Sequence, residues 1–125
     1  MRKCCLISKS DTGHKEVYVC AQNSKEIFAY ILDNKLTKKF HRTLHKVYQN
    51  ASTRDIYENY SAQVSVFKFK GRVNTRIYCK VAKGVPHKIT LVSVEHSKNS
   101  QNLDKKLQSI TNAIEECEYE YYQFF

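Results

Sequence analysis

The sequence predicts an α+β fold in which a small antiparallel sheet carries its helices on one face. Strand and helix patterns occur in runs rather than in strict alternation, which favours α+β over a parallel α/β architecture. Residues 73–81 alternate apolar and polar side chains, as a half-buried strand does. Residues 36–50 repeat apolar side chains every three or four positions, which indicates a helix with one buried face. With 125 residues, the chain is expected to form one domain, 1–125.

The first half of the chain predicts a hairpin followed by two helices. Residues 3–8 and 16–21 are rich in β-type side chains and flank a polar turn that contains Gly13. Asn23 or Ser24 can cap a first helix that begins at residue 25. The second helix should bury Leu36, Phe40, Leu44 and Val47, and the polar residues 50–60 that follow it predict a loop.

The second half predicts three antiparallel strands, a helix and a tail. Turns that contain Gly71 and Gly84 join the strands. The expected elements are strands over 64–69, 73–81 and 87–95, a helix over about 101–118, and an acidic aromatic tail over about 119–125. The helices should lie on one face of the sheet, which leaves the other face for function.

Positive charge is the most informative feature of the composition. The chain carries a net charge of +9, and its last eleven residues contain four glutamates but no Lys or Arg. A basic body attracts phosphate groups or an acidic protein partner. The alternative is a solvated surface that serves only solubility. The acidic residues Glu115 to Glu120 can also fold back on the basic face and screen it.

Composition argues against several other classes of protein. No run of about 18 apolar residues is present, so no membrane span is expected. The basic N-terminus precedes too few apolar residues for a signal peptide, so we expect a cytoplasmic protein. The five cysteines form no Cys-x-x-Cys pair, which predicts neither a zinc site nor a disulfide framework.

The histidines give little support for a metal site. His41 and His45 lie four residues apart on one face of the second predicted helix, a possible two-ligand geometry. No acidic third ligand follows nearby, and the other histidines are dispersed. Neither a glycine-rich phosphate loop nor a nucleophile elbow is present. The sequence therefore predicts no metal and no other cofactor.

The polar face of the central strands is the candidate binding surface. Directly opposite residues of neighbouring strands lie within roughly 5 Å on one face. The planar guanidinium of Arg76 has N–H donors whose spacing matches two phosphate oxygens. Tyr78 can stack on a base of single-stranded RNA. Each side chain can instead be a solvated part of the sheet surface. The candidates are Lys68, Arg76, Tyr78 and Lys80 on the strands, with His96 and Lys98 where the last strand ends.

The stretch RVNTRIYCKV, a glycine turn and KITLVSVEHSKNSQNLDKKLQSITNAI together resemble the C-terminal part of RelE/HigB-like toxins of bacterial toxin–antitoxin pairs. The likeness covers residues 27–118 in element order and 72–107 in motif. It implies a microbial-RNase-like, RelE-type fold and a metal-independent endoribonuclease that cleaves mRNA on the ribosome. It also implies a cognate antitoxin protein as partner.

The resemblance assigns roles to individual residues. Arg76 would stabilise the charge that develops on the scissile phosphate. His96 and Lys98 would bind phosphate or move protons while the 2′-hydroxyl of the RNA attacks. Lys68 and Lys80 would add electrostatic support. The predicted RNA-binding residues are Lys68, Arg72, Tyr78 and Lys80. Members of the family often carry a Tyr or His late in the chain, and the candidates here are Tyr119, Tyr121 and Tyr122.

Two other functions remain open at this point. The chain can be a non-catalytic toxin or binding module of the same fold, which poisons DNA gyrase or binds nucleic acid without cleaving it. It can also be a structural or phage-derived interaction protein.

Overall fold

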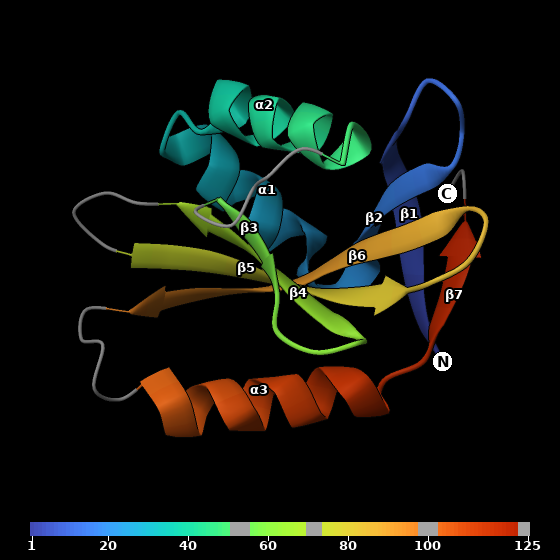
Figure 1. The fold of residues 1–125 in the computed structure, drawn as a ribbon. Coiled ribbons are helices and arrows are strands. Elements are labelled where there is room, and N and C mark those ends of the chain that lie inside the picture. The colour runs from blue at the N-terminus through green and yellow to red at the C-terminus, as the bar shows by residue number, and fades with distance from the viewer. Residues whose placement is uncertain (51–55, 70–73, 98–102, 123–125) are drawn as a thin grey trace.

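The computed structural model describes residues 1–50, 56–69, 74–97 and 103–122. It consists of one sheet and three α-helices (Figure 1). The strands are β1 (Arg2–Lys9), β2 (Lys15–Cys20), β3 (Tyr57–Asn59), β4 (Val64–Phe69), β5 (Asn74–Ala82), β6 (His87–Ser97) and β7 (Tyr119–Tyr122). The helices are α1 (Ser24–Asp33), α2 (Thr37–Tyr48) and α3 (Leu103–Glu116), with a 3₁₀ turn, η1 (Ala21–Asn23), before α1.

The α+β class is confirmed, but the sheet is neither small nor wholly antiparallel. Its seven strands run in the order β3-β4-β5-β6-β2-β1-β7. β2 pairs with β6, and β1 with β7, in parallel. The chain reaches β6 only after the helical pair and the β3–β5 meander, and it reaches β7 only after α3. Such long connections permit parallel pairing, whereas tight turns enforce antiparallel pairing.

The sequence pattern missed the two outermost strands. β3 lies inside the segment predicted as a loop, and it is three residues long. β7 is formed by the acidic aromatic segment predicted as a tail, and it pairs along β1. Short edge strands that carry charged side chains show no apolar alternation, and those charges protect a sheet edge from unwanted pairing.

Helices cover both faces of the sheet, which corrects the expectation that they share one face. α1 and α2 lie on one side and α3 on the other (Figure 1). Phe67 and Ile77 belong to the core under α1 and α2, whereas Val66 and Tyr78 belong to the core under α3. The sequence of β4, VSVFKF, places apolar side chains on both faces, as a strand buried on both sides does. The face expected to remain free therefore packs against α3.

The start of α1 confirms the predicted position but not the predicted role of its cap. The helix begins at Ser24, with Asn23 as the preceding residue. The amide of Asn23 donates to the Val92 carbonyl at 2.6 Å and makes no cap hydrogen bond to the helix. Asn23 thus ties the start of α1 to β6.

None of the helices described is long and apolar enough to cross a membrane.

Candidate functional site

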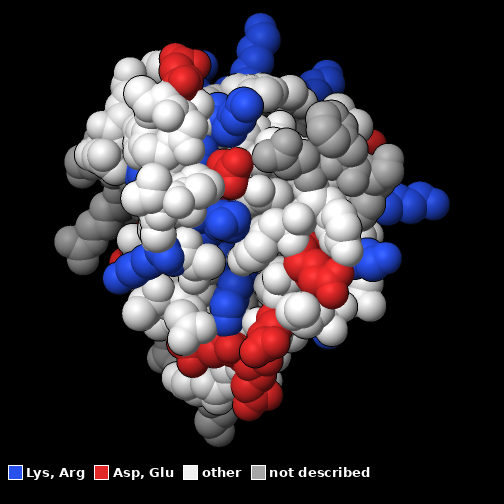
Figure 2. All heavy atoms as spheres, turned by 90° about the vertical axis from the view of Figure 1, so that its right-hand side faces the viewer, with Lys and Arg blue, Asp and Glu red and all other residues white. Residues whose placement is uncertain are grey.

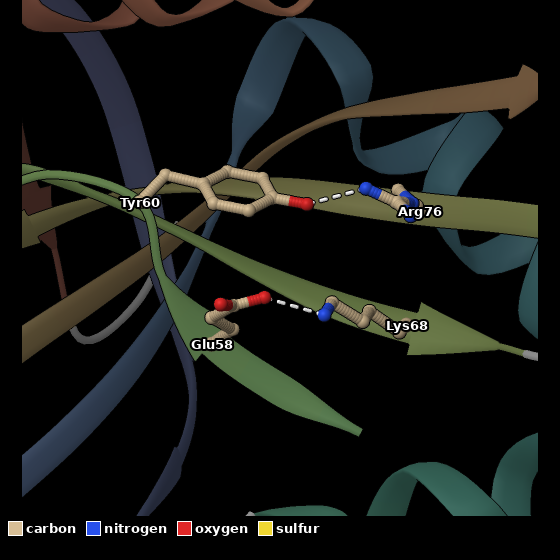
Figure 3. A network of polar contacts seen from close by, with 4 residues as sticks. All are labelled: Glu58, Tyr60, Lys68 and Arg76. Carbon is tan, nitrogen blue, oxygen red and sulfur yellow. Dashed lines mark hydrogen bonds and ion pairs between the residues drawn. The ribbon is translucent and has the colours of Figure 1, made fainter. Parts of the chain in front are cut away.

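Arg76 lies in β5 and belongs to a set of polar contacts with Tyr60, Lys68 and Glu58 (Figure 3). Tyr60 packs against the core on the α3 side of the sheet. In the strand register Arg76 stands between Lys68 of β4 and Glu95 of β6. Its guanidinium is half-buried, and Nη1 donates to the hydroxyl of Tyr60. A guanidinium has five N–H donors in a fixed fork, more than this tyrosine contact uses. Arg76 can therefore contact a phosphate group while it stays anchored to Tyr60.

Lys68 makes an ion pair on the same face. Its ammonium donates to Glu58 Oε2 at 2.5 Å, and the two side chains are 19% and 31% exposed (Figure 3). A pair this open to water contributes at most about 1 kcal/mol to stability, because solvent screens it. The carboxylates of Glu58 and Glu95 offset the charges of Lys68 and Arg76. The network is thus close to neutral and attracts a polyanion only weakly by itself.

Tyr78 does not present its ring to a ligand. The side chain is 2% exposed within the core under α3, and its ring centroid lies 6.3 Å from that of Tyr60. Burial raises the pKa of the Tyr78 hydroxyl, so the phenol stays neutral. Stacking of a base on this ring needs a rearrangement of the α3 side of the core. In the structure Tyr78 packs beneath the Arg76 network.

Lys80 caps the C-terminal end of α3. Its ammonium donates to the carbonyls of Glu115 at 2.8 Å and Ile114 at 3.3 Å, and to Gln63 Oε1 at 2.7 Å. The last carbonyls of a helix lack partners inside the helix and carry partial negative charge, so a cation stabilises them. The described contacts of Lys80 are therefore explained by the fold without any RNA.

The change Lys80→Met is expected to lower the free energy of unfolding by about 1 kcal/mol, because two carbonyls at the end of α3 lose a charged donor. Chemical denaturation measures this loss. Lys25→Met, at an exposed position in the first turn of α1, is the matched control and should change stability less. Equal effects of both substitutions would show that the contact to α3 contributes nothing specific.

The remaining predicted residues are only partly described. His96 pairs with Thr75 in the backbone register, whereas Arg76 pairs with Glu95. The register therefore does not set His96 directly opposite Arg76. Arg72 and Lys98 lie outside the described residues.

The late tyrosines lie far from Arg76. Tyr119, Tyr121 and Tyr122 are in β7, four strands away from β5 in the sheet. Strands are about 4.8 Å apart, which gives a separation of roughly 19 Å. Tyr121 packs edge-on against Tyr18, and Tyr122 donates to Glu120 Oε2 at 2.5 Å. These tyrosines complete the edge of the sheet and do not join the Arg76 network.

Sequence reasoning missed Glu58 and Tyr60, which belong to the network. Both lie in or beside β3, within the segment predicted as a loop. A three-residue strand shows no period that could be recognised. The acid and the asparagine between the two tyrosines of YENY are the signal that could have drawn attention to them.

Charge is unevenly distributed over the surface. Figure 2 shows the side formed by β1, β2 and β7, where Lys and Arg run down the middle and acidic residues gather at the lower end. α2 contains Lys38, Lys39, Arg42 and Lys46 and no acidic residue.

Among the described residues, no group of three or more His, Cys, Asp or Glu could hold a metal ion.

No protein-family model, curated protein or solved structure matches the chain. The likeness to RelE/HigB-like toxins therefore stays a prediction that depends on the motif alone.

Proposed function

We propose that the chain binds RNA and cleaves it without a metal, as the toxin of a toxin–antitoxin pair. The observation that carries the proposal is the anchored Arg76, a guanidinium held in the sheet beside groups that can exchange protons. The net charge of +9 supplies the attraction to a polyanion that the nearly neutral network lacks. The partners proposed with it are the ribosome and a cognate antitoxin protein.

The chemistry needs a base, an acid and a stabiliser of negative charge. The base removes the proton of the RNA 2′-hydroxyl, and the 2′-oxygen then attacks the neighbouring phosphorus. The 5′-oxygen leaves with a proton from the acid, which gives a cyclic 2′,3′-phosphate and a 5′-hydroxyl end. Arg76 stabilises the charge on the phosphate oxygens. Proton-exchanging groups described in the network are Tyr60, which Arg76 contacts, Glu95, its neighbour in the strand register, and Glu58, which pairs with Lys68. His96 and Lys98 keep the roles that the resemblance gives them.

Incubation of the purified chain with a defined mRNA in a translation extract tests this function. We expect fragments whose 5′-hydroxyl ends accept phosphate from a polynucleotide kinase without prior phosphatase treatment. Glu58→Gln should slow the cleavage because an amide cannot take up a proton. Intact mRNA after treatment with folded wild-type protein would reject the proposal.

One observation favours a second function, RNA binding without cleavage. Lys68 pairs with Glu58, and Lys80 donates to the end of α3. Fewer cations are therefore available to contact RNA beside Arg76 than the alternating sequence of the strands predicts. A binding module of this kind is expected to hold RNA with an affinity that falls steeply with salt and to leave the strand intact. Filter binding at several salt concentrations, with gel analysis of the recovered RNA, distinguishes the two functions.

A further inference from the structure

A pocket of about 360 Å³ lies between the β1–β2 turn and the C-terminal half of α2. Figure 1 shows this turn beside that end of the helix, on the opposite face of the sheet from α3. The titratable residues on its lining are Lys9, Asp11, His14, His41, His45 and Tyr48. Two of the imidazoles belong to α2, and the fold brings the third to them from the hairpin. We call this site the histidine pocket.

Two contacts join the opposite walls of the histidine pocket. The hydroxyl of Tyr48 donates to Ser8 Oγ at 2.5 Å, and burial raises the pKa of that hydroxyl. The ammonium of Lys15 donates to the Val47 carbonyl at 2.7 Å and to the side-chain oxygen of Asn50. Both contacts connect the hairpin with the end of α2. The pocket is therefore shaped before a ligand arrives, which lowers the entropic cost of binding.

His14 is held by its backbone and by one nitrogen of its ring. Its carbonyl accepts the N–H of His87 at 2.8 Å. The hydroxyls of Ser10 and Thr12 contact its Nδ1, the first at 3.2 Å. Ser10 Oγ already accepts the N–H of Lys15 at 3.1 Å, so its own proton can go to Nδ1. The proton of the neutral ring then lies on Nε2, which becomes the donor to a ligand.

The charge of the histidine pocket depends on its imidazoles. Among the described lining residues, Asp11 is the acidic group, and Lys9 offsets it. The carbonyls at the end of α2 disfavour an anion, but the Lys15 ammonium neutralises part of their effect. His41 and His45 are exposed on a helix with four Lys or Arg and no acid. Protonated imidazoles therefore give the pocket a positive charge.

A tetrahedral oxyanion fits this set of groups better than a metal ion. Within the described part of the chain, His, Cys, Asp and Glu nowhere form a metal-holding group of three. Hydroxyl, imidazolium and ammonium groups are donors, and charge-assisted donors bind phosphate oxygens strongly. The volume is near the lower end of the roughly 300–1,000 Å³ that ligand pockets span, enough for a small ligand.

We propose that the histidine pocket binds a phosphate group, free or in a mononucleotide, through His14, His41 and His45. The site lies on the α2 side of the sheet and shares no residue with the Arg76 network. Its occupation therefore does not depend on whether the chain cleaves RNA.

Titration of the full chain at pH 6 with inorganic phosphate, and separately with adenosine 5′-monophosphate, tests the proposal. We expect saturable changes in the NMR signals of the three imidazoles and of the turn at residues 10–13. Tighter binding of the nucleotide identifies the phosphate ester as the ligand, and equal affinity identifies free phosphate. Either result supports the site. Absence of saturable changes in the pocket up to tens of millimolar ligand would overturn it.

Histidine variants test which residues bind. His45→Gln and the double variant His41→Gln/His45→Gln should weaken phosphate binding roughly tenfold or more, since each removes a charged donor. Both positions are exposed on α2, so the fold should persist, which urea unfolding checks. His87→Gln is the matched control because His87 lies outside the lining. Unchanged affinity in the double variant, or the same loss in the control, would reject the assignment.

Sulfate and Zn²⁺ distinguish an anion site from a metal site. Sulfate, a tetrahedral oxyanion like phosphate, should bind with the same dependence on His41 and His45. Tighter binding of Zn²⁺ with the same histidine dependence would contradict the proposal.

Discussion

Replacing Arg76 with alanine is expected to lower RNA cleavage about 10²–10³-fold, the usual cost of one lost donor that stabilises transition-state charge. Arg76 stands between Lys68 and Glu95 in the strand register and its guanidinium donates to Tyr60, so its position is set before RNA arrives. The initial rate of mRNA cleavage in a translation extract measures the effect. Arg76→Lys should restore only part of the rate, because an ammonium cannot make the two parallel contacts of a guanidinium.

Lys83→Ala is the matched control for this experiment. Lys83 is exposed in the turn after β5, so its loss changes the net charge equally and leaves the network intact. Urea unfolding must show that both variants are folded under the assay conditions. Equal cleavage by the two variants would remove Arg76 from the mechanism. Growth after induced expression gives an independent readout, since Arg76→Ala should relieve an arrest that Lys83→Ala preserves.

Strong local patterns predicted most of the elements. β5 alternates apolar and polar side chains over its middle, and α2 repeats Phe40, Leu44 and Val47 at helical spacing. Both were expected within two residues of their observed ends. The two edge strands, the parallel pairings and the position of α3 depend on contacts between distant segments, which periodicity does not encode. The apolar residues on both faces of β4 were the local sign that helices cover both sides.

The candidate site was predicted less completely for the same reason. The sequence placed Lys68 and Arg76 on neighbouring strands, and the structure sets them directly opposite each other in the register. The sequence could not show that Lys68 would be engaged by Glu58, because the acid comes from the short strand β3. Nor could it show that Lys80 would donate to the backbone carbonyl of Glu115. Every residue has a carbonyl, so the sequence does not mark which one a lysine will contact. A pattern identifies which face of a strand a cation occupies, but its partners come from the tertiary fold.

Phe67→Ala is expected to lower the free energy of unfolding by about 3–5 kcal/mol, the usual cost of deleting a buried phenylalanine ring. Phe67 is 0% exposed in β4, where it links α2 to the edge of the sheet. Its ring stacks on Phe40 at 5.3 Å between centroids and contacts Tyr57 at 4.8 Å. Urea denaturation measures the loss, and total stability of such domains is only about 5–15 kcal/mol.

Phe28→Ala provides the comparison for this core substitution. Phe28 is 38% exposed on α1, so its removal should cost less than half as much as removal of Phe67. Because Tyr57 precedes Glu58 in β3, loss of the Phe67 ring should also loosen the carboxylate that pairs with Lys68. Phe67→Leu keeps most of the apolar volume and should retain more stability and cleavage than Phe67→Ala. Comparable stability of Phe67→Ala and Phe28→Ala would show that the contacts between α2, β4 and β3 do not support the edge that carries the Arg76 network.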